Sequence, residues 1–172
     1  LGFFDENSLN PSVRWGAVHA LAVLPSGTLV AGGYFHLSSI DLDGNLPDTV
    51  QSAAKWNAAT SQWEALGTFD GTPTEPNEPH IPAIVRSFSV DDGMLYVGGD
   101  FAGVNGNGGR CIAQWSGEKW PNYPYPWRPY GSGFVAGDSV RALLMRGPYY
   151  PLAGGKFSTG KGFVRLSDWD LG

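Results

Sequence analysis

Hydrophobic and polar residues alternate over short stretches of the 172-residue chain, a period of two that predicts β-strands. The segment HALAV at 19–23 alternates up to a turn signal at 25–27 (PSG), and DDG at 91–93 marks an equivalent tight hairpin connection. The runs TLVAGG at 28–33 and MLYVGG at 94–99 are almost continuously apolar, as expected for strands covered on both faces. The pattern therefore predicts an all-β protein of short antiparallel strands.

Three segments of the chain resemble one another, and overlooking such a repeat would mis-assign the whole fold. They are VHALAVLPSGTLVAGGYF at 18–35, VRSFSVDDGMLYVGGDF at 85–101 and VRALLMRGPYYPLAGGKF at 140–157. Each ends in two glycines, which permit close backbone approach or a positive φ where the chain leaves the sheet. The phenylalanines that follow are expected at equivalent core positions: Phe35, Phe101 and Phe157.

Tryptophans extend the repeat beyond the glycine pairs. Trp56, Trp115 and Trp169 occupy matching places after a variable loop. A second tryptophan follows at Trp63 in the first unit and at Trp120 in the second. These pieces predict a third and a fourth strand in each unit, with the third unit ending before its fourth. Four antiparallel strands in each repeated unit are typical of β-propeller blades.

The pattern V-x-A-L-A-V-x-P-x-G-x-L-V-x-G-G-x-F, preceded by FDENSLNP and followed by RLSDWDLG, resembles the delta-60 type repeat of large secreted bacterial proteins. The W-x-x-L-G ending is similar to that of kelch-like surface propellers. This resemblance covers the three units and implies a β-propeller that is extracellular or on a cell surface, without implying an activity. We expect about three blades: the end of a preceding blade at 1–17, a first blade at 18–84, a second with a proline- and aromatic-rich loop at 85–139, and an incomplete third at 140–172.

The two ends of the chain look complementary. LGFF at 1–4 resembles LGTF at 66–69, which is expected to close the first unit, whereas the third unit lacks a closing strand. Three blades fall short of the roughly four to eight that close a propeller, and unpaired strand edges recruit further strands. We therefore expect the missing blades to come from another copy, by head-to-tail pairing into a ring or a filament, with sequence outside these 172 residues as the alternative source. The expected assembly residues are Leu1, Gly2, Phe3, Phe4, Phe163, Leu166 and Trp169.

The segment KWPNYPYPWRPYGSGF at 119–134 concentrates aromatic residues among prolines. Prolines hold the backbone extended and display aromatic faces at low entropic cost, which suits stacking on sugars or proline-rich peptides. A second interpretation packs the same rings on the edge of their own blade or against a neighbouring subunit. The candidates for ligand or subunit contact are Trp120, Tyr123, Tyr125, Trp127, Arg128 and Tyr130.

The most metal-like segment is IDLDGNLPD at 40–48, which offers oxygen ligands of the kind that Ca²⁺ prefers. The candidate ligands are Asp41, Asp43, Asn45 and Asp48. An EF-hand requires glycine at its sixth position and glutamate at its twelfth, where this chain has Leu46 and Ser52. A solvated Asp/Asn/Gly turn accounts for the same residues without an ion. We therefore expect no cofactor, with calcium as the alternative.

Signatures of catalysis are scarce. His19, His36 and His80 lack metal-ligand spacing, and the glycines at 103–109 match neither a dinucleotide-binding turn nor a phosphate loop. Cys111, the single cysteine, precedes an apolar strand and is expected to be a buried, inert thiol. We therefore expect a protein that is not an enzyme.

The charge and hydropathy of the chain limit the binding partners that we expect. The formal net charge of -5 comes without a basic patch to neutralise phosphates, so nucleic acid is not expected. No apolar run in the sequence is long enough to span a membrane. The sequence predicts a noncatalytic extracellular structural or adhesion module that associates with its own copies. The alternative is a carbohydrate-binding, lectin-like propeller that holds glycans with its aromatic loops.

Overall fold

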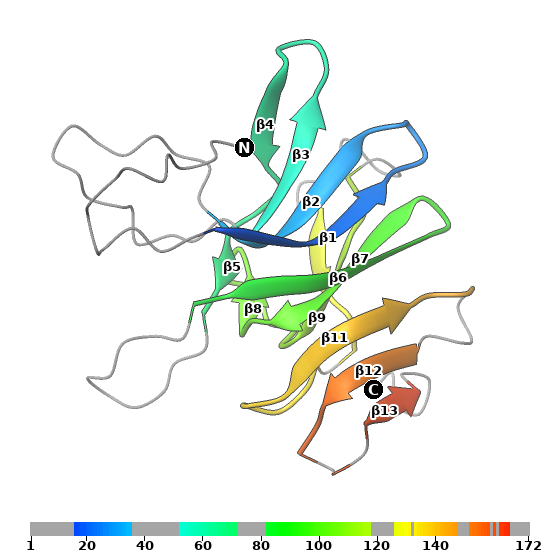
Figure 1. Ribbon diagram of the computed structural model, residues 1–172. Coiled ribbons are helices and arrows are strands. Elements are labelled where there is room, and N and C mark those ends of the chain that lie inside the picture. The colour runs from blue at the N-terminus through cyan, green and yellow to red at the C-terminus, as the bar shows by residue number, and fades with distance from the viewer. Residues whose placement is uncertain are drawn as a thin grey trace, which may run out of the picture.

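A computed structural model of the chain describes residues 16–35, 52–71, 82–117, 126–131, 133–147, 152–158, 160 and 162–165, with only the backbone of 163–165. These residues contain antiparallel β-sheets and no helix, which confirms the all-β prediction (Figure 1). It follows that no helix within these ranges is long and apolar enough to cross a membrane.

Three sheets follow one another along the chain, each as an antiparallel meander. The first contains β1 (Ala17–Val23), β2 (Leu29–Tyr34), β3 (Ala53–Asn57) and β4 (Gln62–Ala65) in that order. The second contains β6 (Ile84–Asp91), β7 (Met94–Asp100), β9 (Ile112–Trp115) and β10 (Trp127–Pro129). The third contains β11 (Ser139–Leu144), β12 (Leu152–Lys156) and β13 (Phe163–Arg165). A short ribbon pairs β5 (Phe69–Asp70) with β8 (Gly103–Val104).

The hairpin turns are the ones that the sequence predicts. Asp92 and Gly93 connect β6 to β7 with φ of 47° and 74°, and two positive φ values in succession match the twist of flanking strands. Gly27 has a φ of 87° in the turn between β1 and β2, where the Thr28 amide donates to Ser26 Oγ at 3.1 Å. Short turns of this kind fix the register of each hairpin.

A β-bulge explains the second glycine of each pair. The register of the first two strands shifts between Val85 and Ser87 in the second sheet, and at equivalent places in the first and third sheets. Gly99 lies opposite Val85, and a Cβ at position 99 would overlap the Ile84 carbonyl oxygen. Position 33 meets the carbonyl oxygen of Ala17 in the same way, and position 155 that of Ser139. None of the six paired glycines has a positive φ, so close backbone approach is what these positions require.

The three sheets stack in one row. Strand β6 lies against β1 and β2, and β11 lies against β6 and β7, so the second step of the stack repeats the first (Figure 1). Leu95 and Val97 of β7 are buried in the core shared with the first sheet, whereas Tyr96 between them belongs to the core shared with the third. The second sheet is therefore covered on both faces, as its continuous apolar run predicts. Among the described residues the row stays open and no ring closes.

The repeat alignment is confirmed for the core phenylalanines and for two tryptophans. Phe35, Phe101 and Phe157 each follow the second strand of their sheet and are buried. Trp56 lies in β3 and Trp115 in β9, the third strands of the first and second sheets.

The prediction that Trp120 belongs to the fourth strand is wrong. Strand β10 starts at Trp127, which lies opposite Trp115 just as Trp63 lies opposite Trp56. The connection between the third and fourth strands is longer in the second unit than in the first, so the spacing between tryptophans misleads. Trp120 itself lies outside the described residues.

The segment at 66–69 does not close the first sheet as a fourth strand, which corrects a second expectation. Strand β4 ends at Ala65, and the chain continues to β5, where Phe69 pairs with Val104 and Asp70 with Gly103 of the second unit. The Thr68 amide donates to Asn105 Oδ1 at 2.8 Å. The segment therefore fastens the first sheet to the second.

The third unit has three strands within the described part of the chain. Gly162 occupies the place of Ser52 and Cys111, because its carbonyl accepts from the second glycine of its pair at 3.0 Å. Trp56 lies four residues after Ser52, and Trp115 lies four residues after Cys111. Position 166 in the third unit therefore corresponds to these tryptophans, and position 169 does not. Leu166 and Trp169 lie outside the described residues, as do residues 1–4.

Candidate functional site

The structure describes only part of the aromatic segment at 119–134 that is predicted to contact a ligand or a subunit. Within the described part, Trp127 is a core residue. Trp127 is 3% exposed, and its indole N–H donates to the Leu66 carbonyl at 2.8 Å. Its ring meets Phe69 edge to face, with ring centroids 5.3 Å apart. Trp127 therefore packs between the second sheet and the segment that links it to the first, as in the interpretation that packs these rings on their own blade.

The other described members of the loop also pack on their own sheet. Tyr130 is half-buried and meets Tyr96 edge to face, with centroids 5.5 Å apart. Burial raises the pKa of the Tyr130 hydroxyl and raises that of Tyr96 to about 12. Arg128 is half-buried opposite Gln114. The remaining candidates, Trp120, Tyr123 and Tyr125, lie outside the described residues.

The structure gathers no metal site in the residues that it describes. No three or more His, Cys, Asp or Glu side chains come together there as a metal ion would need. The calcium candidates Asp41, Asp43, Asn45 and Asp48 lie outside the described ranges, as do His36 and His80.

Cys111 is the buried thiol that the sequence predicts. It is 2% exposed, and its Sγ donates to the Asp138 carbonyl oxygen at 3.2 Å. Burial raises the pKa of this thiol from 9.0 to about 12. A thiol with so high a pKa carries almost no nucleophilic thiolate near neutral pH.

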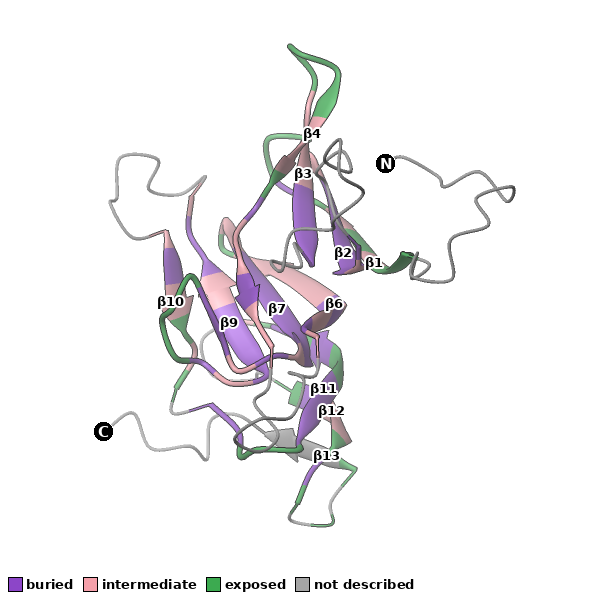
Figure 2. Ribbon diagram, turned by 90° about the vertical axis from the view of Figure 1, so that its left-hand side faces the viewer, coloured by how far each residue is buried: buried purple, intermediate pink, exposed green. Residues whose placement is uncertain are grey.

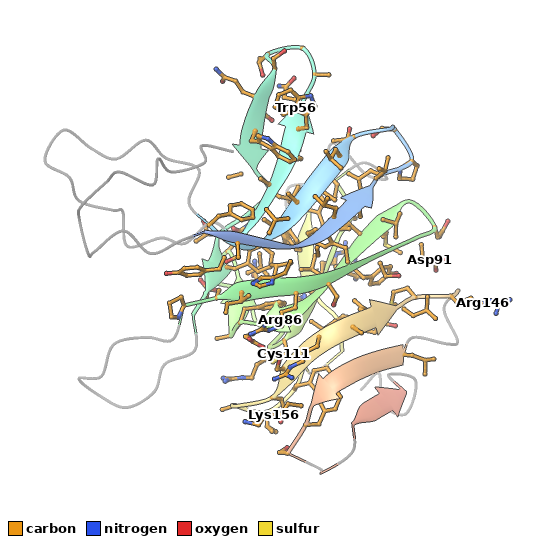
Figure 3. The ribbon with its side chains drawn as sticks, in the orientation of Figure 1. Trp56, Arg86, Asp91, Cys111, Arg146 and Lys156 are labelled. Carbon is orange, nitrogen blue, oxygen red and sulfur yellow. The ribbon has the colours of Figure 1, made fainter. Side chains whose placement is uncertain are left out.

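Polar side chains fasten the third sheet to the second. Ser89 Oγ of β6 accepts from the Met145 amide at 2.9 Å, and Asp91 Oδ2 accepts from the Gly147 amide at 3.0 Å. Asp91 is labelled in Figure 3 at the hairpin end of β6, facing the end of β11. At the other end of β6, Arg86 in the bulge pairs with Asp100 of β7. Asp91 and Asp100 therefore each have a structural partner within the described residues.

In the first and second sheets, the first glycine of the pair is where the following sheet packs. Val85 and Phe88 of β6 pack over Gly32 so closely that a Cβ at position 32 would lie 2.6 Å from Phe88 Cζ. Val140 of β11 packs over Gly98 in the same way, 2.5 Å from a Cβ placed there. Val85 and Val140 are both fully buried. Val85 and Val140 lie near the start of the first strand of their sheets, and each packs on a glycine of the preceding sheet. We call a valine at this position the knob.

The equivalent valine of the first sheet is exposed instead of buried. Val18 of β1, equivalent to Val85 and Val140 by register, is 43% exposed. Leu21 and Val23 on the same side of β1 are 63% and 61% exposed. We call Val18, Leu21 and Val23 the β1 face; Figure 2 shows the exposed stretches of β1 at one end of the stack.

The repeat shows what normally covers such a face. Leu21 corresponds to Leu143 of β11, and Val23 corresponds to Met145 just after that strand. Leu143 and Met145 are buried against the second sheet at 9% and 5% exposure. Exposed apolar side chains clustered on one face mark an interaction site in a soluble protein. The β1 face is therefore the strongest candidate functional site in the described part of the chain.

The sequence does not single out the β1 face, because the first strands of all three sheets (β1, β6 and β11) carry the same apolar alternation.

Comparison with known proteins adds no further identification. No protein-family model matches the chain, and no curated protein matches it.

Proposed function

We propose that this chain is a noncatalytic structural module of propeller-type blades that associates with its own copies through the end sheets of the stack. The observation that carries the proposal is the β1 face, whose three residues are exposed although their equivalents in the third unit are buried against a neighbouring sheet. Covering such a face removes apolar surface from water, which drives association. The partner with the matching surface is another unit of the same repeat.

A propeller-type architecture is part of this proposal. Four-stranded antiparallel meanders that stack by one repeated relationship support it, because radial repetition of such sheets builds a propeller. Closure into a ring requires further sheets, and a head-to-tail contact supplies them. Whether copies form a closed ring or a filament depends on the rotation from one copy to the next.

Strand exchange between residues 1–4 and the segment at 163–169 is one route to such a contact. Support for it is the third sheet, which has three described strands where the other two have four. The behaviour of 66–69 favours a different route, because that related segment pairs with the following sheet of its own chain. We therefore place the self-association on the apolar faces of the end sheets.

The carbohydrate-binding alternative gains no support from the described aromatic residues, since Trp127 is buried and Tyr130 packs on Tyr96. The extracellular location that the family resemblance implies stays a prediction. Adhesion likewise stays a prediction, because self-association alone accounts for the β1 face.

Sedimentation velocity of the purified 172-residue chain over a range of concentrations tests the proposal. We expect species larger than one chain that grow with concentration, and their loss in Leu21→Glu, because a carboxylate on the β1 face cannot be buried cheaply. Val135→Glu is the matched control, since Val135 is 52% exposed and lies outside the β1 face. A wild-type chain that stays monomeric throughout, or equal effects of the two substitutions, would contradict the proposal.

A further inference from the structure

We propose that the β1 face docks on the outer face of the third sheet of a second copy, with Val18 of one copy seated on Gly154 of the other. This inference rests on the proposed function and names the surface that receives the β1 face. It makes the contact between copies a third instance of the contact between consecutive sheets.

Gly154 corresponds to two glycines that are covered by the following sheet. By register it matches Gly32 and Gly98, each of which lies under a valine of the following sheet. Among the described atoms, the nearest to a Cβ added at Gly154 are Ala142 Cβ at 3.8 Å and the Gly162 carbonyl oxygen at 3.9 Å. Within the described residues, no side chain of a following sheet lies over Gly154 as Val85 lies over Gly32 and Val140 over Gly98; we call this position the notch.

The surface around the notch is apolar and exposed where its counterparts are buried. Leu152 lies at the register position of Val30 and Tyr96, which are 0% and 5% exposed between sheets, yet Leu152 is 40% exposed. Leu144 on β11 is 54% exposed. The third sheet thus presents an apolar face that a further sheet would cover.

A second copy of the chain is the occupant that fits both ends. One end of the stack has an exposed valine knob, and the other end has the half-buried notch at Gly154 with two exposed leucines beside it. Both types of surface meet twice inside the chain, between the first and second sheets and between the second and third. Because the knob and the notch are different surfaces, the contact is head to tail.

Filling the notch tests the inference without disturbing the isolated fold. A Cβ added at Gly154 meets described atoms only at ordinary contact distances, and Gly154 has no positive φ, so Gly154→Val is compatible with the sheet. We expect it to weaken association roughly 10- to 100-fold, the effect of overpacking a filled interface. Gly162→Val is the matched control, because an added Cβ at Gly162 meets nothing within 4 Å. Circular dichroism and urea unfolding of both variants establish that they are folded.

Mixing two blocked variants then distinguishes head-to-tail docking from other arrangements. Leu21→Glu has a blocked knob and an open notch, and Gly154→Val has the reverse, so we expect each to be monomeric alone. A one-to-one mixture should form a species of two chains and nothing larger, because only one productive interface remains.

The outcomes separate this inference from the proposed function. If Gly154→Val associates like the wild type while Leu21→Glu does not, self-association stands and the Gly154 notch is wrong. If the mixture stays monomeric although the wild type associates, the β1 face pairs with itself or elsewhere, and head-to-tail docking is overturned. A monomeric wild type overturns both proposals.

Discussion

Val140 of the third sheet packs directly on Gly98 of the second, leaving no room for a Cβ between them. A Cβ at position 98 would lie 2.5 Å from Val140 Cγ1, and the valine is fully buried by this contact. Gly154 lies at the same register of the next sheet, and no described valine packs on it. Adding a side chain at this position of the repeat should therefore change the free energy of unfolding differently in the second and the third sheet.

Alanine substitutions at these two glycines should have different effects on stability. Gly98→Ala should lower the free energy of unfolding by about 1–3 kcal/mol, because its Cβ overpacks the interface. Gly154→Ala should leave it unchanged or raise it by roughly 0.5–1 kcal/mol, since alanine loses less backbone entropy than glycine. Urea unfolding of monomeric samples measures both, and equal losses at the two positions would show that the sheets do not stack as described.

The second glycine of a pair should tolerate substitution even less. In Gly99→Ala the new Cβ meets the Ile84 carbonyl oxygen, a backbone atom that cannot rotate away. We expect a loss of about 3 kcal/mol or more, above the usual range for overpacking. Gly108→Ala is the control, because Gly108 is exposed with nothing within 4 Å of an added Cβ. Normal stability of Gly99→Ala would argue against the bulge at Val85–Ser87.

The indole of Trp127 should stabilise the fold through its hydrogen bond as well as through the packing of its ring. Trp127→Phe leaves the buried Leu66 carbonyl without its donor, and we expect a loss of about 1–3 kcal/mol in the free energy of unfolding. Trp63→Phe, at the equivalent place in the first sheet, should cost less because Trp63 is half-buried. Chemical denaturation followed by circular dichroism compares the two; an equal cost would assign the effect to ring size alone.

Local features of the fold could be predicted from the sequence because they depend on short-range chemistry. The Asp92-Gly93 turn, the alternating inner strands and the close approach at the glycine pairs all follow from residue type and spacing. The buried state of Cys111 follows in the same way.

Features that depend on distant partners could not be predicted. Nothing near Phe69 in the sequence indicates that it pairs with Val104, and the position of Trp127 opposite Trp115 depends on a loop of unusual length. The exposure of Val18 was equally hidden, because its local sequence matches that of the buried Val85. Only the arrangement of neighbouring sheets separates the two valines.

Alkaline pH should destabilise the fold through Cys111. Burial raises the pKa of this thiol from 9.0 to about 12, so the unfolded chain loses its proton first as pH rises. Stability from this group is therefore fully present below pH 9.0 and is lost as pH rises towards 12. Urea unfolding along a pH series should show a decline that is shallower in Cys111→Ala. Parallel pH profiles for the two proteins would contradict the assignment to Cys111.

Disulfide trapping between Leu21→Cys and Leu152→Cys chains tests the central claim most directly. Their register equivalents Leu143 and Tyr96 lie in one core cluster between consecutive sheets. The native Cys111 is buried and does not compete, so mild oxidation reports on the new thiols. We predict that a mixture of the two variants forms a covalent dimer of one chain of each kind, well above the level reached with Val135→Cys in place of Leu21→Cys. Trapping no better than this control, or dimers of Leu21→Cys with itself in preference to Leu152→Cys, would contradict the account.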